Sequence, residues 1–123
     1  MLNKNHRLTS YSAFVATYRQ RNLVSDENLV LYGGKLKDSD KNYPTRVGFV
    51  VSKKIHKRAV KRNRIKRLMR ASYAYLLKSG EISGSQKFQS LIFIANPNSL
   101  NIEYKQMCSS VKQLIDNLAI KNI

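Results

Sequence analysis

The sequence has little of what several classes of protein need. It contains no tryptophan, one cysteine (Cys108), and seven acidic residues against 23 basic ones in 123 residues. One cysteine cannot form a disulfide or a cysteine zinc site within the chain, and we expect Cys108 to be a small buried residue of the last helix. No run approaches the roughly 18 consecutive apolar residues that span a bilayer, and the first residues carry no apolar signal segment. These absences predict one cytoplasmic domain, residues 1–123, with no membrane partner.

The shortage of acids also restricts the chemistry that the chain can perform. A protein that hydrolysed RNA by itself would need paired carboxylates for metal ions, or a histidine with an acid partner. The acids are scattered over expected loops and helix ends, and both His6 and His56 lie among basic residues. The run Asp38-Ser39-Asp40 could hold a metal weakly, but in a polar loop it is expected to serve solvation. We therefore predict no catalytic residue and no metal site in the protein.

The basic residues are concentrated in one segment. Ten of the eighteen residues from Lys53 to Arg70 are Lys or Arg, and none is acidic. A cationic field of this density attracts phosphate-bearing partners, and its effect weakens as salt rises. A basic amphipathic helix can also lie on an anionic membrane, but such a helix would stand apart from a fold, whereas expected strands flank this one. Nucleic acid is therefore the leading partner.

Hydrophobic periodicity divides the chain into a helix, two or three strands, a helix, a strand and a helix. The expected strands cover residues 23–24, 28–32, 45–52 and 90–95, and the second and third of them are expected to pair as a hairpin. Gly48 predicts the close approach of another group. The apolar run 90–95 predicts a strand buried on both faces. Gly80 is expected to end the basic helix, and Asn101 to cap the last one.

The basic helix has two faces of different chemistry. One stripe, expected to pack on the fold, carries Ile65, Leu68, Met69, Ser72 and Leu76. The opposite side is expected to carry Arg62, Asn63, Lys66, Arg67 and Arg70. Because Arg62, Lys66 and Arg70 recur every four residues, they predict three exposed cations in a row, about 6 Å apart. That spacing is close to that of successive phosphates on an extended strand.

At Arg62-Asn63-Arg64 the chain resembles the protein subunit of bacterial ribonuclease P. The surrounding signature runs from Ala59 to Arg70 and is preceded by residues 47–54, VGFVVSKK. The likeness extends over essentially the full length, through His6-Arg7-Leu8, Phe14, residues 29–32 and residues 94–97. It implies an α+β fold, a single-domain α-β-β-β-α-β-α sandwich. It also implies a left-handed β-α-β crossover through the basic helix, as in the second domain of ribosomal protein S5, against the usual right-handed rule.

The resemblance also implies a function. The enzyme of this family is a ribonucleoprotein in which a large RNA performs the hydrolysis with Mg²⁺. The protein binds that catalytic RNA and grips the 5′ leader of precursor tRNA, with no protein partner required. Magnesium would be bound mainly by the RNA subunit and by phosphates.

The resemblance assigns two sets of binding residues. The residues expected to contact the catalytic RNA are Lys53, Lys54, Arg58, Arg62, Asn63, Arg64, Lys66, Arg67 and Arg70. Arginine suits this surface because its planar fork pairs bidentately with phosphate oxygens. Asn63 either fixes a neighbouring side chain or contacts RNA. The residues expected to bind the leader are Phe14, Tyr18 and Tyr32, which could stack on bases without regard to sequence; core packing is the alternative for each ring.

Other functions remain possible at this stage. A structural RNA-binding protein, such as a ribosomal protein, needs a basic helix but no aromatic cleft. A helix-turn-helix DNA reader would need a second short helix before the basic one, where strands are expected instead. A metal-dependent nuclease would need carboxylates that the chain does not group together.

Overall fold

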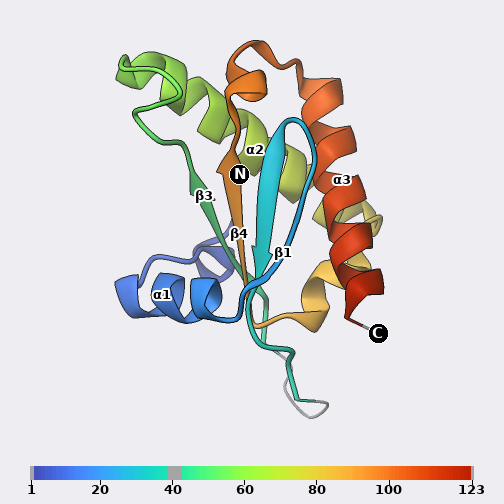
Figure 1. Ribbon diagram of the computed structural model, residues 1–123. Coiled ribbons are helices and arrows are strands. Elements are labelled where there is room, and N and C mark those ends of the chain that lie inside the picture. Colours follow the sequence, from blue (N-terminus) through green and yellow to red (C-terminus); the bar gives the residue numbers. More distant parts are fainter. Residues whose placement is uncertain (1, 39–42, 123) are drawn as a thin grey trace.

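The fold is described by a computed structural model that covers residues 2–38 and 43–122 (Figure 1). In chain order its main elements are α1 (Tyr11–Arg19), β1 (Asn22–Ser25), β2 (Leu29–Gly33), β3 (Arg46–Val50), α2 (Ala59–Ser79), β4 (Ser90–Ala95) and α3 (Tyr104–Lys121). Short 3-10 helices cover Lys4–His6, Ser83–Lys87 and Pro97–Asn101. The predicted α-β-β-β-α-β-α order is confirmed.

The four strands form one mixed sheet in the order β1-β2-β4-β3. β2 is antiparallel to both β1 and β4, whereas β3 is parallel to β4, with α2 in the connection between them. The predicted hairpin between the second and third strands is therefore wrong, because β4 lies between β2 and β3. β4 is the most apolar strand, and the central position buries both of its faces: Leu91, Ile92 and Phe93 have no exposed surface.

The two faces of the sheet are covered differently. Figure 1 shows α1 on one side of the sheet and α2 and α3 on the other. The main core lies on the α2 and α3 side, where the strands contribute Leu29, Leu31, Val47, Leu91, Phe93 and Ala95. Because successive strand side chains alternate between faces, the intervening residues of β2, β3 and β4 face α1.

Of the two predicted helix ends, the stop of α2 at Gly80 is confirmed and the start of α3 at Asn101 is wrong. α2 ends at Gly80, whose φ of 81° is the left-handed conformation that glycine adopts without a Cβ clash. α3 is not capped by Asn101, which instead ends the preceding 3-10 helix. Its N-cap is Glu103, whose side chain accepts from the backbone of Gln106, while the Gln106 side chain accepts from the Glu103 N–H at 3.1 Å. This reciprocal capping box satisfies two backbone donors at the start of the helix, and Asn101 has no such partner at the right spacing.

Within the described ranges, no helix combines the length and the apolar character that a membrane crossing requires.

Candidate nucleic-acid interface

The basic segment consists of a loop and the first half of α2. Residues 53–58 connect β3 to the helix, and Arg58 occupies the N-cap position. Among residues 2–38 and 43–122, the only ion pair joins Lys112 to Asp116 within α3, at 2.9 Å. None of the cations of the basic segment is therefore neutralised by a described carboxylate, and their charge is available to a polyanion.

Two arginines of the signature are used inside the protein. Nη1 of Arg62 donates to the carbonyl oxygens of His56 and Lys57, both at 2.8 Å, so this side chain holds the loop that precedes α2. Nη2 of Arg64 donates to the carbonyl of Ile102 at 3.0 Å and ties α2 to the segment before α3. Both guanidinium groups therefore hold backbone segments in place, a role that the sequence pattern did not predict.

The prediction of three exposed cations in a row is wrong. Arg62, Lys66 and Arg70 are all half-buried, along the edge of the stripe that packs on the fold. Tyr73 explains the shift: it is completely buried and extends the packed stripe toward these residues. The line that is most exposed runs instead through Asn63 and Arg67. Among the predicted RNA-binding residues, the exposed ones are Lys53, Lys54, Arg58, Asn63 and Arg67.

The exposed side of α2 is hollowed between its cations. A shallow hollow of about 400 Å³ is lined by Val60, Asn63, Lys66, Arg67 and Arg70. The guanidinium carbon of Arg70 lies 6.0 Å from the centroid of the Phe49 ring, and this cation–π contact fixes its orientation. Asn63 makes no side-chain hydrogen bond to the described residues, so its amide is free to meet a ligand.

The three predicted leader-binding rings lie together on the other face of the sheet. Gly48, Ile92 and Tyr32 form one row across β3, β4 and β2. α1 crosses this row: the Phe14 ring lies over Gly48, and the Tyr18 ring meets Tyr32 edge-on, with centroids 4.9 Å apart and planes at 84°. The predicted close approach at Gly48 is confirmed, and the group that approaches is Phe14.

These rings are neither fully buried nor part of the main core. Phe14, Tyr18 and Tyr32 are all half-buried, and none belongs to the hydrophobic cluster under α2 and α3. Burial raises the pKa of Tyr18, and the nearby Tyr32 hydroxyl raises it further, so Tyr18 keeps its proton at neutral pH. On the same face, the next row of the sheet consists of Val50, Ile94 and Val30, all half-exposed. The rings therefore border a partly accessible apolar strip of the sheet.

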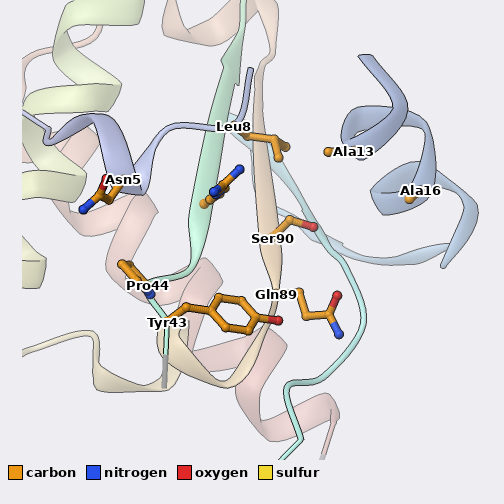
Figure 2. Close-up of a pocket in the computed structure, with 9 residues that line it drawn as sticks. Asn5, Leu8, Ala13, Ala16, Tyr43, Pro44, Gln89 and Ser90 are labelled. Carbon is orange, nitrogen blue, oxygen red and sulfur yellow. The ribbon is translucent and has the colours of Figure 1, made fainter. Parts of the chain in front are cut away.

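A second hollow lies beside α1, and sequence reasoning missed it. Its volume is about 390 Å³, and Figure 2 shows the side chains that line it, from Asn5 and Leu8 to Tyr43, Gln89 and Ser90. The lining comes from the N-terminal segment, from α1, from residues 43–46 at the start of β3, and from Gln89 and Ser90 at the start of β4. No local sequence signal could have found it, because four separated segments supply its walls.

The acidic and histidine side chains of the described residues are dispersed. No group of three or more His, Cys, Asp or Glu is placed to hold a metal in residues 2–38 and 43–122. Asp26 accepts from the N–H groups of Asn28 and Leu29, and Nδ1 of His56 accepts from the N–H of Arg58 at 3.0 Å. Asp38 is exposed, and Ser39 and Asp40 lie outside the described residues. Cys108 is half-buried on α3, more exposed than predicted.

Comparison with known proteins gives a consistent result over the whole chain. The family model of ribonuclease P matches residues 2–119. The ribonuclease P protein component of a Cyanothece species is 30% identical in an alignment of 132 residues, gaps included. This alignment covers 98% of this chain and 97% of the relative. The protein component of Alkaliphilus metalliredigens is 31% identical, covering 97% of this chain and 98% of that one.

Solved structures show the same fold. The RNase P protein of Staphylococcus aureus superposes with a TM-score of 0.72 at 25% identity, over 98% of this chain and 94% of that chain. The RNase P protein of Thermotoga maritima superposes with a TM-score of 0.71 at 19% identity, over 90% and 96%. Both likenesses confirm the α+β sandwich with its mixed sheet, while the handedness of the β3-α2-β4 crossover stays a prediction.

Proposed function

The chain belongs to the ribonuclease P protein family, and on that premise we propose that it binds the catalytic RNA and the 5′ leader of precursor tRNA. It is the protein component of a ribonucleoprotein endonuclease whose RNA subunit carries the chemistry. Its contribution to the maturation of tRNA 5′ ends is then binding and positioning. This role places it in the cytoplasm, where it would need no further protein partner.

The observation that carries the proposal is the meeting of two different surfaces at the end of β3. Val50 ends β3 and lies in the half-exposed strip beside the α1 rings, and Lys53 and Lys54 follow three and four residues later. A single strand that crosses the strip therefore arrives at the cationic loop and at the start of α2. A protein that must hold a substrate strand against an RNA enzyme needs this continuity.

The α1 surface supports binding of the leader. A half-buried ring presents an apolar face to a base while its own packing keeps it in place, and stacking of a base on such a ring contributes about 1–3 kcal/mol with little regard to base identity. Leaders differ between precursor tRNAs, so a tolerant contact suits them. Phe14, Tyr18 and Tyr32 provide the rings, and the strip Val50, Ile94 and Val30 provides an apolar floor.

The α2 surface supports binding of the catalytic RNA. Lys53, Lys54, Arg58 and Arg67 are exposed, and Lys66 and Arg70 line a hollow together with Arg67. Arg62 and Arg64 contribute chiefly by fixing the loop and the helix in place, because their guanidinium groups already bond to backbone carbonyls. Asn63, exposed among these cations, would contact RNA directly.

Magnesium is assigned to the RNA in this proposal. The described acids are dispersed, and they do not supply the clustered oxygen ligands that Mg²⁺ prefers. RNA phosphates supply such oxygens. The cation would neutralise phosphate and activate water there, while this chain's own residues bind and orient the two RNAs.

A structural role in another RNA particle, such as the ribosome, is the alternative class. Membership of the ribonuclease P family argues against it. The three half-buried rings beside an apolar strip also argue against it, because a scaffold protein needs only the basic helix.

The test is cleavage of a precursor tRNA at low Mg²⁺ by the catalytic RNA of the same host. Three reactions are compared: RNA alone, protein alone, and both together. We expect efficient 5′ cleavage only with both, because the protein supplies affinity and the RNA supplies chemistry. Cleavage by the protein alone, or no effect of the protein on the RNA, would overturn the proposal.

A further inference from the structure

Two adjoining hollows lie between the N-terminal segment and the outer side of α2. The first, about 640 Å³, is lined by Arg7, Arg67, Arg70 and Ala71. The second, about 430 Å³, is lined by Leu2, Asn3, His6, Ala71, Ala74, Tyr75, Leu77 and Lys78. Ala71 belongs to both, and His6 and Arg7 are consecutive, so the hollows are neighbours with a shared rim. They differ sharply in chemistry.

The first hollow is cationic and preorganised. Nε of Arg7 donates to the carbonyl of Leu2 at 3.1 Å, which anchors the side chain and leaves its terminal nitrogens without a hydrogen bond to the described residues. Arg70 is held over the Phe49 ring. No acid lines the hollow. Guanidinium groups fixed in this way lose little freedom when they pair with an anion, so the hollow suits a phosphate.

The second hollow combines an apolar helix wall with an exposed aromatic ring and polar groups at its rim. Its helix wall is formed by the small side chains of Ala71 and Ala74, and the Tyr75 ring beside them is 57% exposed. Asn3 and Lys78 add polar groups at the rim. His6 contributes to the same lining, and its buried Nδ1 has no hydrogen-bond partner among the described residues. A nucleobase has this combination of a stacking face and hydrogen-bonding edges.

We propose that the paired hollows bind one unpaired nucleotide of the catalytic RNA, with its phosphate between Arg7, Arg67 and Arg70 and its base against Tyr75. The inference rests on the proposed function and adds a specific recognition element to it. The nucleotide must be unpaired because a base within an A-form helix has no free face to stack on a side chain. A second copy of this chain is disfavoured as the occupant because each copy carries a net charge of +16.

Affinity for the catalytic RNA at several salt concentrations tests the proposal in the full chain. Tyr75→Ala should weaken binding about 5-fold or more through loss of stacking, with an unchanged salt slope. Tyr75→Phe keeps the ring and should bind within about twofold of the wild type. Arg7→Ala should lower the slope of log affinity against log salt by about 0.7–0.9. Tyr11→Ala is the matched control, because Tyr11 is 84% exposed and lies on α1, across the sheet.

A second measurement locates the site without the large RNA. Adenosine 5′-monophosphate and inorganic phosphate are titrated into the wild-type chain while side-chain NMR signals are followed. The nucleotide should shift the ring signals of Tyr75 and His6 as well as the guanidinium signals of Arg7. Inorganic phosphate should shift only the guanidinium signals.

The outcomes separate this inference from the proposed function. If the wild-type chain does not bind the catalytic RNA, the proposed function fails. If it binds, but Tyr75→Ala behaves like Tyr11→Ala and the nucleotide leaves the Tyr75 signals unmoved, only the inference fails. Self-association of the free chain that Tyr75→Ala abolishes would assign the second hollow to another copy of the protein and would also overturn it.

Discussion

The ring of Phe14 in α1 lies directly over the bare backbone of Gly48 in β3. A Cβ built on Gly48 would lie 2.5 Å from Cζ and 2.7 Å from Cε1 of Phe14. Both distances are shorter than nonbonded carbon atoms tolerate, so one of the two groups would have to shift. This contact sets how closely α1 approaches the sheet. It also fixes the position of the ring beside the half-exposed strip Val50, Ile94 and Val30.

Gly48→Ala is expected to destabilise the fold. The new methyl group must push Phe14, and with it α1, away from the sheet, and overpacking of this kind costs about 1–3 kcal/mol. Urea unfolding of the wild type and the variant measures the loss. In the double variant Gly48→Ala/Phe14→Leu, the smaller side chain should restore part of the stability that Gly48→Ala removes. If the two effects are simply additive, the contact is not the cause.

Phe14→Ala is expected to weaken binding of substrates that carry a leader. Loss of a stacking ring should reduce the affinity of the holoenzyme for precursor tRNA by about 5-fold or more, with little effect on mature tRNA. Binding of both tRNAs is measured in parallel, with Tyr11→Ala as an exposed aromatic control on the same helix. Equal losses on precursor and mature tRNA would mean that Phe14 only supports the fold.

Substitutions of Arg67 and Arg64 are expected to affect different properties, RNA binding and stability respectively, although both residues belong to the basic signature. Arg67 is exposed and makes no side-chain hydrogen bond to the described residues, so Arg67→Ala should lower the salt slope for binding the catalytic RNA by about 0.7–0.9 and leave stability nearly unchanged. Arg64 donates to the Ile102 carbonyl, so Arg64→Ala should reduce the free energy of unfolding by roughly 1–3 kcal/mol. Salt-dependent binding and urea unfolding of both variants distinguish these roles; the reverse pattern would contradict the assignment.

Tyr73 is expected to make stability depend on alkaline pH. Burial raises its pKa from 10.0 to about 12 in the folded protein. The stability that this neutral phenol contributes is complete below pH 10, and it is lost as pH rises from about 10 to about 12, because only the unfolded chain releases the proton. Two pKa units correspond to about 2–3 kcal/mol. Urea unfolding at pH 9 to 11.5 should show a steeper decline for the wild type than for Tyr73→Phe; parallel curves would refute it.

Much of the local structure could be predicted from the sequence, because it depends on neighbours in the chain. The strand 90–95, the helix stop at Gly80 and the packed stripe from Ile65 to Leu76 all follow from residue types at fixed short spacings. The need for close approach at Gly48 was readable too, since only glycine leaves the backbone bare. The exposure of Arg67 followed from the expected faces of the helix, and that of Lys53 and Lys54 from their place in a charged loop.

Partnerships between distant residues were decided only by the tertiary structure. The sequence determined that the chain is a strongly basic α+β protein with a cationic helix and three candidate rings. It did not determine that β4 would separate β2 from β3, that Arg62 and Arg64 would turn toward backbone carbonyls, or that Arg7 would join Arg67 and Arg70. The physical reason is that strand order and side-chain partners depend on which surfaces exclude the most water together, and that choice is made among segments tens of residues apart.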